Sequence, residues 1–151
     1  MSAPPTDVKK TFAEKVFGPW TIFGIFFGAG TSHLVTPQLW EPAVPPQLPN
    51  PKLMVYLSGV AEIVGALLFI VPRTRKLGGN YLFALLIAVF PANIYMSLEP
   101  KWHARVPGGQ PALLLRLPIQ FLGMWWVREL AKRTTSPAAT AAPATPTKSA
   151  E

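Results

Sequence analysis

The chain has 151 residues, of which half are hydrophobic and only 14% are charged, and its net charge is +7. This balance is typical of membrane proteins and unlike that of a soluble globular domain. The absence of cysteine excludes a disulfide framework, a CxxC redox pair and thiolate metal sites, and two histidines are too few for a haem or zinc centre. We therefore expect no metal site and no intrinsic cofactor.

Four apolar segments are long enough to cross a membrane. They cover residues 16–35, 53–71, 77–98 and 112–130. A helix of roughly 20 residues, rising about 1.5 Å per residue, crosses a hydrocarbon layer about 30 Å thick. The segments occupy more than half of the chain, so the sequence predicts an all-α protein. Its ordered part, residues 16–131, is expected to be a four-helix transmembrane bundle without a soluble catalytic domain.

The two ends of the chain are predicted to be cytoplasmic and to lie outside the bundle. Residues 1–15 lack the features of a cleaved secretory signal, because the apolar run that follows is of full spanning length. In the last segment, residues 132–151, almost every residue from Thr134 onward is Ser, Thr, Ala or Pro. Such a composition cannot bury a core, so we expect a disordered cytoplasmic tail.

The basic residues sort by side of the membrane. One side receives the region before the first segment, the connection between the second and third, and the region after the fourth, and these hold ten basic residues. The other two connections lie on the opposite side and hold three. The ten are Lys9, Lys10, Lys15, Arg73, Arg75, Lys76, Arg128, Lys132, Arg133 and Lys148; the three are Lys52, Lys101 and Arg105. The positive-inside rule then places both termini in the cytoplasm. Attraction to membrane lipid explains the basic charge, so no nucleic-acid partner is expected.

Aromatic, small and proline residues indicate how the bundle is anchored, packed and connected. The tryptophans fall near the two expected membrane boundaries, with Trp40 and Trp102 in the outer belt. Small residues at a spacing of four, such as Gly24 and Gly28, predict close helix packing. The first outer connection, residues 36–52, is rich in proline and is predicted to be stiff and without regular helix. It is either a lid over a pocket or a rigid strap.

Every apolar segment also carries polar side chains that lipid should exclude. They are His33, Ser58, Glu62, Asn93, Arg116 and Gln120. Because successive segments run in opposite directions, all six fall in the outer half of the bundle. Ser58 and Glu62 are four residues apart, as are Arg116 and Gln120, so each pair lies on one helix face. We expect Glu62 to meet Arg116, with Asn93 and Gln120 completing their hydrogen bonds.

This polar cluster has two interpretations. It is either an internal salt bridge that fixes the helix register and binds nothing, or the floor of a pocket that opens outward. Pro91 and Pro118 lie beside the cluster, and each removes a helical hydrogen bond and frees a carbonyl, which favours a widened outer half and hence the pocket.

Four motifs carry a family resemblance. The segments GAGTSHLVTP, VYLSGVAEIVGALLFIVPRTRKLGG, VFPANIYM and LRLPIQ, between Phe27 and Val127, resemble the DoxX-like family of small four-helix bacterial membrane proteins. One departure is Leu34, where similar proteins often have Phe. The resemblance implies a multi-pass protein of the bacterial plasma (inner) membrane. It also implies a redox association, since the family takes its name from a membrane subunit of a thiosulfate:quinone oxidoreductase and some relatives are linked to soluble detoxifying enzymes.

Two functions of different classes remain open. The first is a quinone-linked accessory subunit of an oxidoreductase, in which Glu62 and Arg116 hold the head group, Asn93 and Gln120 hydrogen-bond it, and His33 relays protons. Quinone is then the ligand, and a soluble or membrane oxidoreductase is the partner that supplies electrons. The second is a non-catalytic scaffold or assembly protein whose polar cluster is structural. A transporter is a third possibility that four spans support only as a homo-oligomer.

Overall fold

The computed structural model describes residues 18–133, which are all-helical and contain no strand in that range. Four long helices are joined by short helical connections. The long helices are α2 (Pro19–Val35), α4 (Pro51–Ile70), α5 (Arg75–Leu98) and α7 (Gly109–Arg133); the short ones are α3 (Pro37–Trp40), η1 (Glu41–Ala43) and α6 (Pro100–His103). The predicted all-α class is confirmed. The predictions for residues 1–17 and 134–151 lie outside the described residues.

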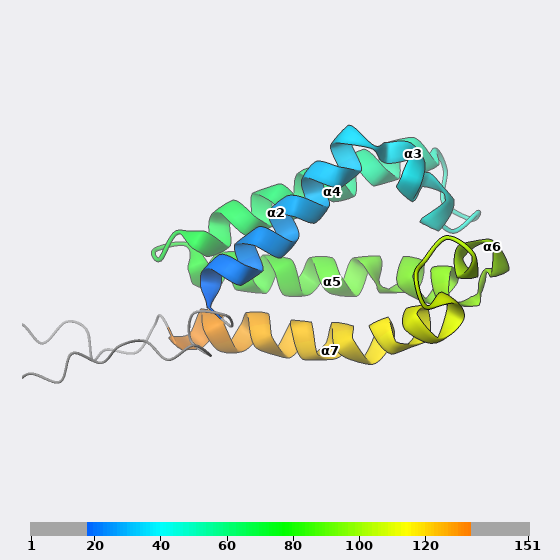
Figure 1. Cartoon of the computed structure of the whole chain (residues 1–151). Coiled ribbons are helices and arrows are strands. Elements are labelled where there is room, and N and C mark those ends of the chain that lie inside the picture. The colour runs from blue at the N-terminus through cyan, green and yellow to red at the C-terminus, as the bar shows by residue number, and fades with distance from the viewer. Residues whose placement is uncertain (1–17, 134–151) are drawn as a thin grey trace, which may run out of the picture.

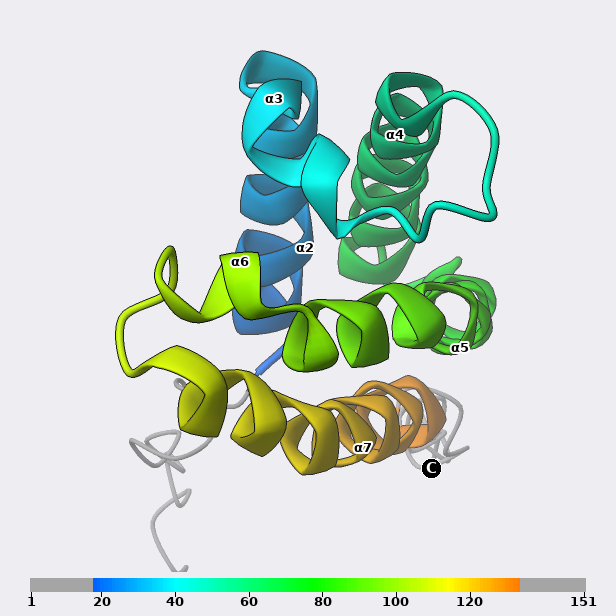
Figure 2. The same ribbon diagram turned by 90° about the vertical axis from the view of Figure 1, so that its right-hand side faces the viewer.

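The long helices form two antiparallel pairs that lie one above the other. α2 packs on α4, α5 packs on α7, and the α4–α5 contact joins the pairs. The pairs are close together where α4 connects to α5, and they diverge toward the end that carries α3 and α6 (Figure 1). In the view along that end, α2 and α4 stand side by side above α5 and α7 (Figure 2). The bundle is therefore wedge-shaped, and its open end is the predicted outer end.

Two of the long helices, α4 and α5, are long and apolar enough to cross a membrane. The other two differ in length and composition. The described part of α2 has 17 residues. α7 has 25 residues but also carries the charged residues Arg116, Arg128, Glu129, Lys132 and Arg133. Length and composition of the described helices thus support two membrane crossings directly.

The prediction that the first outer connection has no regular helix is wrong, because α3 and η1 occupy its first half. Several prolines of the described residues lie where helices begin. α2, α3, α4 and α6 each start on a proline, namely Pro19, Pro37, Pro51 and Pro100. At the first helical position the N–H has no partner in the helix, so its loss costs nothing and the fixed φ is already helical.

Two apolar clusters hold the wedge together, one at each end. At the closed end, Ile22, Phe69, Leu82, Val127 and Ala131 are buried together. At the open end, Ala43, Met96, Trp102 and Leu113 form the second cluster. Trp102, expected in the outer aromatic belt, is instead buried, and its indole N–H donates to the carbonyl of Pro42 at 3.2 Å. This bond ties α6 to η1 across the open end.

The closest approach of α2 and α4 lies at Gly30 and Gly59. A Cβ on Gly30 would lie 2.6 Å from the carbonyl oxygen of Gly59, and a Cβ on Gly59 would lie 2.8 Å from the Cβ of His33. By contrast, a Cβ on Gly24 or Gly28 meets nothing within 4 Å, so the predicted packing role of those two glycines is wrong. Small residues allow helix backbones to touch only where two helices cross, which spacing within one segment does not reveal.

Candidate functional site

The helix crossing places His33 of α2 opposite Glu62 of α4. The imidazole Nδ1 of His33 lies 3.4 Å from Oε2 of Glu62. One turn earlier on α4, the hydroxyl of Ser58 donates to Oε1 of Glu62 at 3.2 Å. Glu62 is only 8% exposed, yet Nδ1 of His33 and Oε2 of Glu62 have no hydrogen-bond partner. The two groups attract each other electrostatically, and each keeps hydrogen-bonding capacity that is not used.

Asn93 and Gln120 form a separate hydrogen-bonded chain between α5 and α7. The amide of Asn93 donates to Oε1 of Gln120 at 2.7 Å, and the amide of Gln120 donates to the carbonyl of Leu86 at 2.7 Å. Gln120 is 7% exposed. Pro91 has no N–H, so one carbonyl in the preceding turn of α5 lacks its helical hydrogen bond. The side-chain amide of Gln120, on α7, donates to the backbone of α5 near this position, at the carbonyl of Leu86. Asn93 and Gln120 therefore satisfy each other and fix α5 on α7.

Arg116 does not form the expected direct pair with Glu62. Among the described residues, the close partners of the Glu62 carboxylate are His33 and Ser58. α7 packs on α5 and not on α4, so Arg116 faces Glu62 from the other side of a cavity. The opposite charges still attract across that space. Arg116 is itself exposed, so its guanidinium can reach a molecule that enters the cavity.

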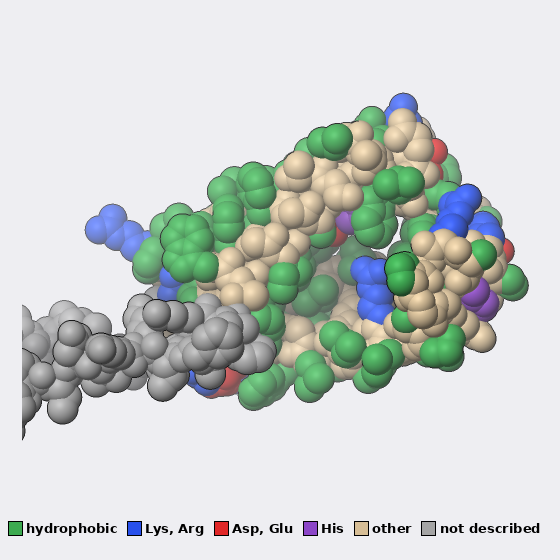
Figure 3. Space-filling view, viewed as in Figure 1, with side chains coloured by type: hydrophobic (Ala, Val, Ile, Leu, Met, Phe, Trp, Pro, Cys, Tyr) green, Lys and Arg blue, Asp and Glu red, His purple; other side chains and the backbone are tan. Residues whose placement is uncertain are grey.

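The polar cavity lies between these groups and has a volume of about 360 Å³. His33, Ser58, Glu62, Asn93 and Arg116 line it, and apolar side chains of α2, α4 and α5 complete its walls. Gln120 is not on the lining and reaches the cavity only through Asn93. Figure 3 shows the hollow between the two helix pairs, with histidine, acidic and basic side chains in its depth. The volume is within the range of about 300 to 1,000 Å³ usual for small-molecule sites.

The first outer connection supplies one wall of this cavity. Its lining residues are Trp40, Ala43, Val44, Pro45 and Leu48. The ring of Trp40 stands edge-on to the imidazole of His33, with centroids 4.7 Å apart, and its N–H donates to the hydroxyl of Ser32 at 2.9 Å. The connection thus forms part of the cavity wall in this structure.

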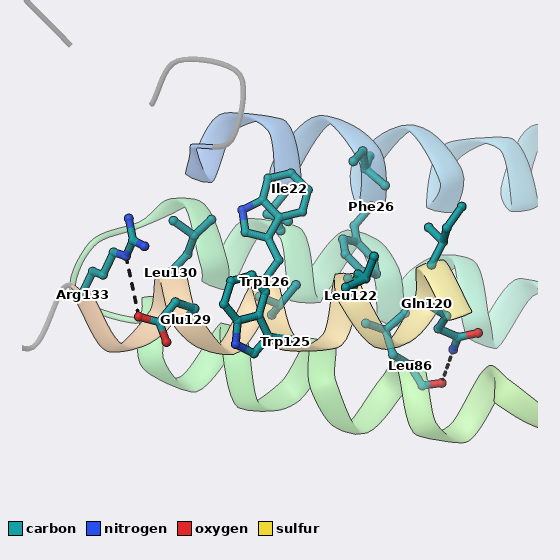
Figure 4. Close-up of a pocket in the computed structure, with 14 residues that line it drawn as sticks. Ile22, Phe26, Leu86, Gln120, Leu122, Trp125, Trp126, Glu129, Leu130 and Arg133 are labelled. Carbon is teal, nitrogen blue, oxygen red and sulfur yellow. Dashed lines mark hydrogen bonds and ion pairs between the residues drawn. The ribbon is translucent and has the colours of Figure 1, made fainter. Parts of the chain in front are cut away.

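A second, larger hollow, which we call the apolar groove, lies between α2 and α7. It has a volume of about 610 Å³. Ile22 and Phe26 of α2 face Leu122, Trp126 and Leu130 of α7 across it (Figure 4). The sequence carried no signal for this groove, because α2 and α7 share the buried cluster at the closed end and yet leave a hollow between them beside it.

Metal-ligating residues are sparse around the polar cavity. His33 and Glu62 are the two that meet there, and over residues 18–133 no group of three or more His, Cys, Asp or Glu side chains comes together.

Comparison with known proteins gives a family without a described activity. The model of a domain of unknown function, DUF8561, matches residues 22–131, which include most of each of the four long helices and every residue of the polar cavity. No match was found among curated proteins, and none among solved structures.

Proposed function

We propose that this chain, which belongs to the DUF8561 family, is a DoxX-like membrane protein that binds a small polar-headed molecule in its polar cavity. We further propose that it serves as a quinone-linked accessory subunit of an oxidoreductase. In this proposal all four long helices cross the bacterial plasma membrane and both termini are cytoplasmic.

The distribution of side chains supports the membrane part of the proposal. Large apolar residues cover the outside of the helices, with Leu57 on α4 55% exposed and Leu122 on α7 65% exposed. Polar residues such as Glu62, Ser97 and Gln120 are buried. This arrangement is the reverse of that in a soluble protein and suits a lipid environment, which dissolves apolar side chains and excludes polar ones.

The single observation that carries the binding proposal is the His33–Glu62 pair. Buried polar groups are nearly always hydrogen-bonded, so a buried nitrogen and a buried carboxylate oxygen without hydrogen bonds need a partner. Both groups line the polar cavity, and Arg116 brings a cation to its opposite side. A head group with acceptors for the guanidinium of Arg116 and a donor for the carboxylate of Glu62 would complement the charges of this site.

A quinone head group has the chemistry that this site requires. Its carbonyl oxygens can accept hydrogen bonds from Arg116 and from an N–H of the His33 imidazole. Reduction to the quinol takes up two electrons and two protons. The electrons would come from the partner oxidoreductase, because the chain has no cysteine. The protons would pass through His33 and Glu62, which are the ionisable pair in contact within the cavity.

Ligand binding tests the proposal. The protein, purified in mild detergent, is expected to retain a lipophilic molecule that mass spectrometry identifies, and to bind added quinone. Glu62→Gln and Arg116→Leu should each weaken binding about tenfold to a hundredfold, the range for losing a charged hydrogen bond of roughly 1.5 to 3 kcal/mol. Matched controls are Glu99→Gln and Arg105→Leu, which lie outside the cavity and should bind normally.

The scaffold function remains the second candidate, because one part of the polar cluster is structural. The chain from Asn93 through Gln120 to the Leu86 carbonyl is complete without a ligand. Two results together would favour the scaffold function: the wild-type protein retains and binds no lipophilic molecule, and Glu62→Gln and Arg116→Leu only destabilise the fold. The polar cluster would then be structural, and the scaffold function would replace the binding function.

A further inference from the structure

The apolar groove adjoins the polar cavity. Ile25, Phe26 and Leu86 line both hollows, so the two hollows meet at these three residues. From this junction the groove follows α7 toward the closed end of the wedge, from Ile119 to Arg133. Fourteen helical steps of about 1.5 Å make this path roughly 20 Å long.

The chemistry of the groove suits an apolar chain. Its middle is lined by aliphatic and aromatic side chains, among them Ile22, Leu122 and Trp126. The polar groups lie at its two ends and are already engaged. Gln120 binds Asn93 and Leu86 at one end, and Arg133 pairs with Glu129 at 3.8 Å at the other (Figure 4).

We propose that the groove holds the apolar tail of the same molecule whose head group lies in the polar cavity. This inference rests on the proposed function and specifies its ligand as an amphiphile with a hydrogen-bonding head and a flexible tail of up to about 20 Å.

Gly123 provides the means to test this assignment. It lines the groove, and a Cβ built on it meets nothing within 4 Å, so a side chain at this position starts in open space. Gly24 on α2 is equally open but lines neither hollow. Gly123→Phe and Gly24→Phe are therefore matched variants, one filling the groove and one not, and Gly123→Ala gives an intermediate filling.

The probes are dimethoxy-methyl-benzoquinone without a tail and the same ring carrying a decyl chain. The wild-type protein should bind the decyl compound more than tenfold tighter than the bare ring, because burial of only two methylenes supplies about that factor. Gly123→Phe should reduce this ratio to near one without weakening the bare ring, Gly123→Ala should reduce it in part, and Gly24→Phe should preserve it.

Each other outcome has a defined meaning. If Gly123→Phe preserves the ratio, or if Gly24→Phe removes it equally, the tail does not lie in the groove, while the proposed head-group site stands. If Gly123→Phe instead converts a dimer to a monomer in detergent and leaves the ratio unchanged, the groove is an interface between copies. If the wild type binds neither probe, the proposed quinone function itself fails.

Discussion

His33 and Glu62 each lie three residues after a glycine, and those two glycines, Gly30 and Gly59, are the point where α2 and α4 touch. Three residues correspond to nearly one helical turn, so each side chain lies on the face of its helix that carries the glycine. The helix crossing and the polar pair are thus parts of one arrangement. A change that separates the helices should also separate the pair.

Gly59→Ala should destabilise the bundle and open the pair. Its new Cβ would lie 2.8 Å from the Cβ of His33 and 2.9 Å from the carbonyl of Gly30, both of which are held by packing. Such overpacking costs typically 1 to 3 kcal/mol, roughly the loss expected in the free energy of unfolding in mixed micelles.

Gly24→Ala is the control for this change, because its Cβ enters open space. There the substitution should leave stability unchanged or raise it by roughly 0.5 to 1 kcal/mol, since glycine is a poor helix former. Equal effects at the two positions would mean that the crossing does not depend on contact at Gly59.

The attraction between His33 and Glu62 should be measurable as a coupling energy. The test is a double-mutant cycle of His33→Leu and Glu62→Gln. The loss in the free energy of unfolding of the double mutant should differ from the sum of the two single losses by about 0.5 to 3 kcal/mol, as for residues in direct contact. The exposed pair Glu129 and Arg133, at 3.8 Å, is the reference and should couple by only about 0.3 to 0.5 kcal/mol. A smaller coupling for the buried pair than for this reference would refute the contact.

That these polar residues gather at one end of the helix bundle could be predicted from the sequence, but their partners could not. Alternating helix direction is enough to bring His33, Glu62 and Arg116 to one end of a bundle, and all three line the polar cavity. Which of them touch depends on the rotation of each helix and on which helices pack. Because α2 packs on α4, Glu62 meets His33, and Arg116 on α7 stays across the cavity.

The proline-rich connection and the apolar groove escaped prediction for different reasons. Composition alone cannot distinguish a proline that breaks a helix from one at the first helical position, such as Pro37 or Pro51. The groove is a hollow between two helices that also share a buried cluster, and the apolar side chains of Phe26 and Leu122 look the same in sequence whether they meet a helix, a lipid or a ligand.

Asn93→Ala should destabilise the protein, although it removes only one hydrogen bond. The oxygen of Gln120, which is 7% exposed, would lose its donor inside the bundle. Leaving a buried polar group without a partner costs about 1 to 3 kcal/mol. Asn80 is on the same helix and exposed, so Asn80→Ala should change the free energy of unfolding by less than about 0.5 kcal/mol. Equal values for the two variants would show that the Asn93–Gln120 bond contributes nothing.

The number of membrane crossings can be decided by single cysteines, because the natural chain has none to interfere. Leu48 lies in the connection before α4, Arg73 lies between α4 and α5, and Lys132 lies near the end of α7. If all four long helices cross, Leu48→Cys should react with a membrane-impermeant maleimide in intact cells, whereas Arg73→Cys and Lys132→Cys should react only after permeabilisation. If only α4 and α5 cross, Lys132→Cys should behave like Leu48→Cys, since both would lie on the side from which α4 enters. Labelling of Lys132→Cys in intact cells together with Leu48→Cys would therefore contradict the four-span bundle, and with it the location of the polar cavity beneath the outer surface.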